Sequence, residues 1–316
     1  MANVTDRSFI VEATNQFFNT LEKELVFDDV VDSWFLMRSP VPVFSIVAVY
    51  LLFILKIGPN MMKNREPYRL KHIMLVYNLF QTGYNAFILY LLFFTPGGLS
   101  SMWYHSCHPI ERSKNTFLLY ELNKGSWYFF ISKVIDLLDT IFFVLRKKQS
   151  QVTFLHVYHH SNMVITCWAY LRFIKGEQST LPGGINSFIH TIMYFYYFLA
   201  ALGPQMQPYL WWKRYLTRMQ ILPLSLSKGN DLTLISGFSV FFFNFTASVC
   251  SPTMMSNRQL TPVTVGHFIF GFLNGYLHSR NWSAGVTFGA SVENRFFRKK
   301  YFGTNSETYG TNRYKL

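Results

Sequence analysis

The sequence contains little charge and little cysteine. Only 14% of its 316 residues are charged, against about 25% in an ordinary soluble protein. The three cysteines lack the short spacings of a zinc or redox site. We find no Gly-rich dinucleotide loop and no basic, then apolar, secretory leader in the first 33 residues. Membrane insertion is therefore expected to depend on internal spans.

Long apolar segments dominate what is present. Half of the residues are hydrophobic and 19% are aromatic. A spanning helix needs about 20 mostly apolar residues. Seven segments of this kind are expected, at about 41–57, 73–95, 127–146, 154–174, 185–202, 232–250 and 263–278. The sequence therefore predicts an all-α, multi-pass membrane protein with about seven transmembrane helices.

Basic residues outnumber acidic residues by 29 to 16, and they gather in short runs between the apolar segments. No basic stripe follows a polar surface, so nucleic-acid binding is not expected. Lys and Arg favour cytosolic loops, and the most basic loops are 57–72, 146–153 and 203–218. This asymmetry predicts a lumenal segment over 1–33, one transmembrane domain over 34–280 and a cytosolic tail over 281–316.

Ionisable and polar residues interrupt three of the expected spans at helical spacing. They are Lys133, Asp136 and Asp139 in the third span, His156, His159 and His160 in the fourth, and His190, Tyr194 and Tyr197 in the fifth. Ionisable groups inside a span are costly, and they mark a functional site by default. We expect these side chains to form one site in the cytosolic half of the membrane. A neutral imidazole there can attack a thioester, and a carboxylate can orient the ring.

Three motifs, "KVIDLLDT", "HVYHH" and "HTIMYFYY", resemble in order and separation those of the ELO family of very-long-chain fatty acid elongases, in an insect-like form. Residues 58–78 resemble the segment between the family's first two spans. The first motif departs from the family's, because Asp136 replaces a Glu. In "TRMQ", Arg218 replaces a Gln of the family's motif while Gln220 is retained. The likeness fades after about residue 222.

The resemblance implies a very-long-chain 3-oxoacyl-CoA synthase in which six of the seven helices enclose a tunnel for the acyl chain. Such an enzyme condenses a long-chain acyl-CoA with malonyl-CoA, releases CO2 and CoA, and uses no cofactor. The resemblance also implies the endoplasmic reticulum membrane, with the reductase and dehydratase of the elongation cycle as partners. A homo-oligomer is a further expectation.

The resemblance carries roles to individual residues. It implies a catalytic set made of His159 as nucleophile with His156, His160, His190, Asp136 and Asp139. It implies a substrate-binding set of Lys133, Tyr194, Tyr197, Arg218 and Gln220. The family carries a cysteine near Cys107 and near Cys250, which suggests a lumenal disulfide between them. Cys167 is expected to be a free, buried thiol.

Two other classes remain open. A membrane di-iron desaturase or hydroxylase also uses histidine boxes, because imidazole suits iron, but it needs about eight ligands in three boxes. This chain has one complete box, so no metal site is expected. The other alternative is an inactive relative whose sixth and seventh spans no longer close the tunnel. A count of bound iron tests the first alternative, and an activity assay tests the second.

Overall fold

The computed structural model describes residues 26, 28–104, 110–111, 113–175, 180–213 and 215–216. Its regular elements are all helical within these residues, which confirms the expected all-α class for this part of the chain. The long helices are α3 (Pro40–Leu52), α5 (Lys71–Phe94), α7 (Thr116–Leu145), α8 (Phe154–Ala169) and α9 (Thr180–Leu202). The short elements are α2 (Asp29–Ser33), α4 (Gly58–Met62), α6 (Gly98–Tyr104), the π-helical turns η1 (Phe53–Ile57) and η3 (Tyr170–Ile174), and the 3-10 turns η2 (Gln149–Gln151) and η5 (Pro204–Leu210).

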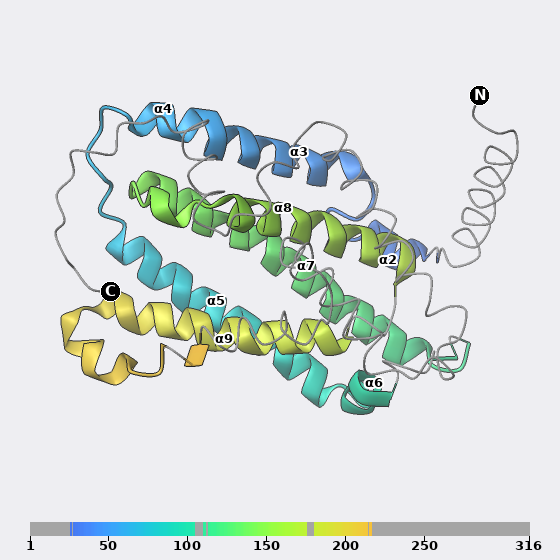
Figure 1. The fold of residues 1–316 in the computed structure, drawn as a ribbon. Helices are drawn as coiled ribbons and strands as arrows, with labels where there is room; N and C mark the ends of the chain where they lie inside the picture. Colours follow the sequence, from blue (N-terminus) through green and yellow to red (C-terminus); the bar gives the residue numbers. More distant parts are fainter. Residues whose placement is uncertain are drawn as a thin grey trace, which may run out of the picture.

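The long helices form two groups that α7 connects (Figure 1). In the first group α3 packs on α8, and in the second α5 packs extensively on α9. Helix α7 contacts α8 on one side and α5 and α9 on the other, whereas α8 and α9 do not pack closely on each other. Side chains from α7 can therefore meet side chains from every long helix around it.

Five of the seven expected spans lie within the described residues, and each of them folds as a helix. The third begins at Thr116 rather than near 127, so the expected loop over 96–126 is wrong in part. Its first turns remain helical because Leu119 and Leu122, one turn apart, are buried against Ile110. Two helical segments of the described chain, 40–62 and 180–202, are long and apolar enough to cross a membrane. The sixth and seventh expected spans lie outside the described residues.

A close contact holds the end of the first long segment against α7. Gly58 begins α4, and a methyl group added there would lie 2.7 Å from a side-chain carbon of Val144. Only glycine fits at this approach without a shift of its neighbours. The π turn η1 lies directly before Gly58 and Pro59, and Pro59 has no N–H to donate to the preceding turn.

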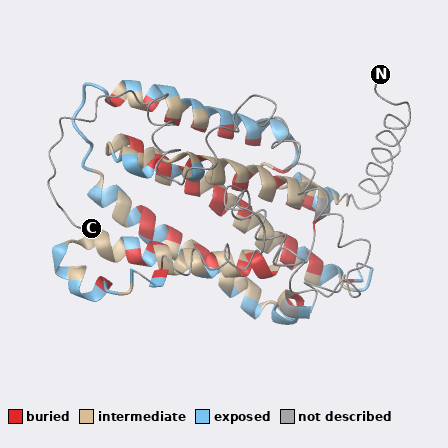
Figure 2. Cartoon of the chain, viewed as in Figure 1, coloured by how far each residue is buried: buried red, intermediate tan, exposed pale blue. Residues whose placement is uncertain are grey.

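The largest apolar cluster joins α3, α7 and α8. Val47 from α3, Phe130 and Leu137 from α7, and Val164 and Trp168 from α8 are all buried in it. Buried positions follow the faces that these helices turn toward one another (Figure 2). This packing fixes the rotation of α7 and α8, and therefore the direction of the polar residues on each helix.

An ion cluster ties the segment before α3 to the end of η3. Lys175 lies 2.8 Å from Asp32 Oδ1, and Arg172 forms a second ion pair with Asp32. Burial disfavours a charged Asp32, but the hydrogen bonds and charges of the two cations outweigh it and lower the pKa of Asp32. Burial also lowers the pKa of Lys175. The cluster is therefore strongest near neutral pH, where all three groups are charged.

Candidate functional site

A buried lysine–aspartate pair lies at the centre of α7. Lys133 and Asp136 are one helical turn apart, and Lys133 Nζ lies 3.0 Å from Asp136 Oδ2. Their side chains are 3% and 1% exposed. Lys133 also donates to Asn186 Oδ1 of α9 at 2.9 Å, and Gln81 Nε2 of α5 donates to Asp136 Oδ1 at 2.5 Å. Three helices therefore converge on this one ion pair.

Tyr194 of α9 connects the two carboxylates of α7. Its hydroxyl oxygen lies 2.9 Å from Asp136 Oδ1 and 2.6 Å from Asp139 Oδ2. The Tyr194 side chain is fully buried, and its ring packs edge-on against Tyr77 of α5. The hydroxyl is therefore enclosed between two carboxylates, and the expected role of Tyr194 in substrate contact stays a prediction.

His190 lies one turn before Tyr194, at the edge of the same cluster. Its Nδ1 is 3.5 Å from Lys133 Nζ and 3.6 Å from Asp136 Oδ2. An ammonium group only donates, so the contact with Lys133 favours the tautomer whose proton is on Nε2. The other side of the ring then presents an N–H donor.

The three histidines of α8 have different surroundings. His156 Nε2 lies 2.9 Å from Thr140 Oγ1, which accepts a hydrogen bond from Tyr50 at the same distance. A threonine of α7, rather than a carboxylate, therefore contacts Nε2 of His156, and the orientation of a histidine ring by a carboxylate stays a prediction. His160 contacts both of the other rings, with centroids 4.4 Å from His156 and 5.4 Å from His159.

His159 has no hydrogen-bond partner on either ring nitrogen within the described part of the chain. Its ring is nevertheless close enough to Lys133, Asp136 and His190 to interact with them electrostatically. His160 likewise makes no hydrogen bond within the described residues, but its ring packs against both of the other histidine rings of α8. No three His, Cys, Asp or Glu side chains of the described residues are arranged to hold a metal ion.

Two of the remaining predicted residues, Tyr197 and Cys167, lie within the described part of the chain. Tyr197 is 41% exposed, and its ring contacts that of Tyr194. Cys167 is free as expected, but it is partly rather than fully buried. The remaining predicted residues, Arg218, Gln220, Cys107 and Cys250, lie outside the described residues.

Sequence reasoning missed three partners of the site, Gln81, Asn186 and Thr140. All are neutral polar residues inside helices. The free energy of burying such a residue in a span is smaller than that of burying a charge, so its presence is a weaker sign of a functional site. A signal was present for Gln81, because Asn78, Gln81 and Asn85 follow one another at helical spacing in an apolar segment, and all three are buried.

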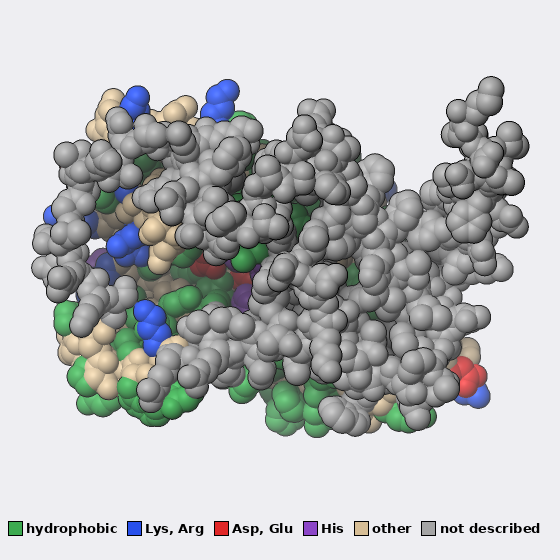
Figure 3. Space-filling view, in the orientation of Figure 1, with side chains coloured by type: hydrophobic (Ala, Val, Ile, Leu, Met, Phe, Trp, Pro, Cys, Tyr) green, Lys and Arg blue, Asp and Glu red, His purple; other side chains and the backbone are tan. Residues whose placement is uncertain are grey.

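A hollow gives access to the site on one face of the molecule. Figure 3 shows acidic and histidine side chains deep between the two groups of helices, with Lys and Arg side chains nearer the same end. Helices α8 and α9, which carry the four histidines of the site, do not pack closely on each other. Within the described residues, the three imidazoles of α8 are partly rather than fully buried.

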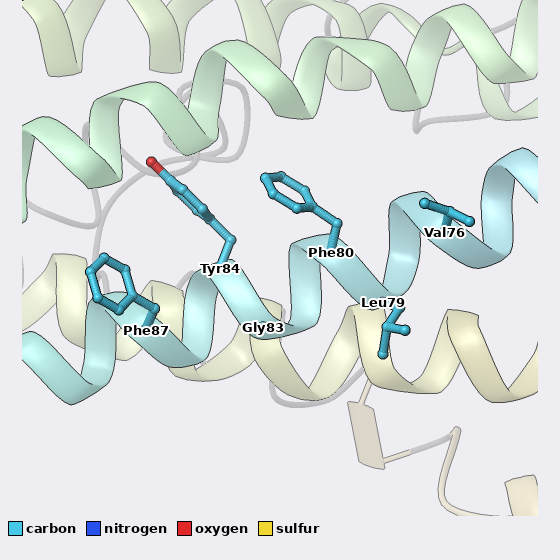
Figure 4. A pocket seen from close by; sticks show the side chains of 6 residues that line it. All are labelled: Val76, Leu79, Phe80, Gly83, Tyr84 and Phe87. Carbon is cyan, nitrogen blue, oxygen red and sulfur yellow. The ribbon is translucent and has the colours of Figure 1, made fainter.

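An apolar groove follows the exposed face of α5. It has a volume of about 430 Å³ and is lined by Val76, Leu79, Phe80, Gly83, Tyr84 and Phe87. Figure 4 shows Phe80 and Tyr84 projecting from α5 toward the neighbouring helix. None of the residues that line the groove is charged. Along α5, the lining residues Phe80 and Gly83 flank Gln81, which donates a hydrogen bond to Asp136.

Two basic loops meet at one end of α7. Tyr68 N donates to Leu145 O at 3.1 Å, and Lys147 Nζ donates to Lys63 O at 3.5 Å. Arg65 lies in the same loop and donates to the Tyr68 hydroxyl at 2.8 Å. These bonds bring the basic segments 63–71 and 146–148 together at the end of the helix that carries Asp136 and Asp139.

Comparison with known proteins finds a family match and similar sequences. The ELO (GNS1/SUR4) family model matches residues 35–281. Human (Homo sapiens) very long chain fatty acid elongase 4 is 41% identical over 203 residues, which cover 64% of this chain and 63% of the human protein. The mouse (Mus musculus) protein of the same name is 41% identical over 254 residues, 80% of this chain and 76% of the relative. Very long chain fatty acid elongase 7 of Drosophila melanogaster is 37% identical over 209 residues, 66% and 61% of the two chains.

Proposed function

The chain belongs to the ELO family, and from that membership we propose that it is a fatty acid elongase. The reaction that we propose condenses a long-chain acyl-CoA with malonyl-CoA to give a 3-oxoacyl-CoA two carbons longer, with CO2 and CoA as the other products. The relatives are named as very long chain fatty acid elongases, and the alignment spans 63% of the human relative's length. The two co-substrates supply all of this chemistry, so the proposal includes no cofactor.

One observation carries the proposal most directly. Within the described residues His159 has no hydrogen-bond partner, and its ring lies close enough to the Lys133–Asp136 ion pair and to His190 to interact with them electrostatically. Acyl transfer requires a nucleophile, and condensation requires groups that stabilise the negative charge of an enolate. An imidazole without a hydrogen-bond partner among the described residues, a cation and an N–H donor together supply both needs.

We assign the first step to His159. Its neutral ring attacks the thioester carbonyl, the C–S bond breaks, and the acyl group becomes an acyl-imidazole. The CoA thiolate leaves with the bonding electrons and takes up one proton. His156 is less suited to this attack, because Thr140 already occupies its Nε2.

We assign the second step to the α9 side of the cluster. Malonyl-CoA loses its carboxylate as CO2, and the electron pair remains on the thioester as an enolate. The Nε2–H of His190 is the donor that stabilises the enolate oxygen, and the ammonium of Lys133, whose three N–H groups face Asp136, Asn186 and His190, adds its positive charge. The enolate carbon then attacks the acyl-imidazole, and His159 departs as neutral imidazole after protonation.

Two surfaces suit the two ends of an acyl-CoA. The apolar groove along α5 suits an aliphatic chain, because none of its six lining residues is charged. The basic segments 63–71 and 146–148 suit the phosphates of CoA, because Lys and Arg bind phosphate by charge-assisted bonds. We include Arg218 and Gln220 in this substrate-binding set on the basis of the motif "TRMQ".

The proposal includes a cellular setting. An elongase of this family is embedded in a lipid bilayer, and we propose the endoplasmic reticulum membrane. In the proposed topology the N-terminal segment is lumenal and the basic loops face the cytosol, where CoA esters are soluble. The reductase and dehydratase that complete an elongation cycle are the proposed partners.

Product analysis tests the proposed reaction. The purified full chain is incubated with malonyl-CoA and a ladder of saturated and unsaturated acyl-CoAs, and the products are measured by mass spectrometry. We expect 3-oxoacyl-CoAs that are two carbons longer than the substrate, absent with His159→Ala. A wild-type protein that forms no such product from any member of the ladder would contradict the proposal.

A further inference from the structure

The two aspartates of α7 share a tyrosine hydroxyl that has too few protons for both of them. Tyr194 Oη lies 2.9 Å from Asp136 Oδ1 and 2.6 Å from Asp139 Oδ2, and both are hydrogen-bond distances. A hydroxyl carries one proton, and an ionised carboxylate carries none. One of the two contacts therefore needs a second proton, which a carboxyl group must hold.

The remaining contacts decide which aspartate holds this proton. Asp136 already accepts from Gln81 at 2.5 Å on one oxygen and from Lys133 at 3.0 Å on the other. These donors satisfy a charged carboxylate, and they leave no acceptor that an Asp136 proton would meet. Among the described residues, Asp139 has only the neutral hydroxyls of Tyr194 and Tyr77 as hydrogen-bond partners, and it has no direct bond to the ammonium of Lys133.

We propose that Asp139 is a neutral carboxylic acid that donates to Tyr194, which in turn donates to a charged Asp136. This order gives every hydrogen one acceptor at the distances observed. It also balances the charge, because Lys133, the one positive group that the described residues bring to the cluster, is paired with one negative group. Like charges on two carboxylates that touch one oxygen would disfavour ionisation of both.

Tyr194 and Asp139 are then positioning residues. They hold Asp136 from the side opposite Lys133, and Asp136 in turn fixes the ammonium that lies 3.5 Å from His190. The other titratable groups that face the cluster are Tyr77 from α5, His190 from α9 and His159 from α8. The positioning role of Tyr194 and Asp139 in catalysis rests on the proposed elongase activity. The protonation of Asp139 does not depend on that activity.

Infrared spectroscopy tests the acid without reference to activity. The full chain, labelled with 13C at the aspartate carboxyl carbon, is measured at neutral pH as wild type, Asp139→Asn, Tyr194→Phe and Asp32→Asn. We expect a protonated-carboxyl C=O band in the wild type that Asp139→Asn removes. The control Asp32→Asn keeps the band, because Asp32 is ion-paired with two cations. Tyr194→Phe shifts the band, because the hydrogen bond of the acid is lost.

Absence of the band from wild-type protein, or its persistence in Asp139→Asn, would overturn the proposal. A band that stays at the same frequency in Tyr194→Phe would overturn the bridging role of the tyrosine. The steady-state rate gives a second readout. Asn keeps a neutral donor at position 139, so we expect Asp139→Asn to retain turnover within about tenfold of wild type and Asp139→Ala to lose more than that. Equal losses in the two variants would count against a neutral Asp139.

Discussion

Removal of the buried ammonium of Lys133 is expected to destabilise the protein far more than removal of an exposed ammonium from the same helix. Lys133 and Asp136 are 3% and 1% exposed and 3.0 Å apart. Breaking such a pair leaves a buried charge without its partner and costs about 3–5 kcal/mol. Gln81 and Tyr194 still donate to Asp136, so we expect Lys133→Met to cost about 3 kcal/mol, near the lower end of that range.

A matched control is available one pair earlier in α7. Lys124 lies 3.5 Å from Glu121, also at a spacing of three residues, with 36% and 18% of the two side chains exposed. A pair this exposed contributes about 0–1 kcal/mol, so Lys124→Met is expected to cost little. The assay is denaturant unfolding of the full chain in detergent, with turnover measured in parallel.

The double variant Lys133→Met/Asp136→Asn separates stability from function. Asn at 136 retains a neutral acceptor for Gln81 and Tyr194 and leaves no unpaired charge, so stability should return to within about 1 kcal/mol of wild type. Turnover should remain lost, because the ammonium is absent. If Lys133→Met is no less stable than Lys124→Met, or if the double variant is as unstable as the single one, the reasoning is refuted.

Three further predictions concern other parts of the chain. Gly58→Ala should destabilise by about 1–3 kcal/mol, because the new methyl would lie 2.7 Å from α7, whereas Gly83→Ala has no atom within 4 Å to meet and should be neutral or stabilising; equal unfolding midpoints would contradict this. Asp32→Asn should cost about 1–3 kcal/mol at neutral pH. The folded-state pKa of Asp32 is lowered, so its contribution to stability is present above pH of about 4 and is lost as the pH falls through the folded-state pKa. The free energies of unfolding of wild type and Asp32→Asn should therefore converge in acid. A difference that stays constant with pH would exclude the ion cluster as the cause. Non-reducing mass mapping should find Cys107 joined to Cys250, a bridge that could add about 4 kcal/mol, and two free thiols would refute it.

The sequence predicted much of the site because helical spacing determines which residues share a face. Lys133, Asp136 and Asp139 do point into one cluster, and His190 and Tyr194 meet it from α9. Local spacing cannot say which partner a side chain finds on another helix. Thr140 rather than a carboxylate contacts His156 for this reason, because that contact depends on how α7 packs on α8.

The ends of the helices are likewise set by contacts that local sequence does not reveal. Helix α7 starts at Thr116 because Leu119 and Leu122 pack against Ile110. An average of hydropathy along the sequence does not detect such a contact. The bridge that Tyr194 forms was missed in a similar way. A tyrosine on a polar helix face is equally compatible with a substrate contact and with a buried bridge, and the bridge depends on the position of α7.

Single-turnover release of CoA tests the acyl-imidazole at His159 most directly. The full chain is mixed with acyl-CoA in the absence of malonyl-CoA, and free CoA is measured against enzyme concentration. We predict a burst of up to one CoA per active site in wild-type protein, with a His159-linked acyl group detected by mass spectrometry of the peptide. His159→Ala should abolish the burst, and unfolding measurements should show that it remains folded. A normal burst from His159→Ala, or an acyl group on another residue, would contradict the account.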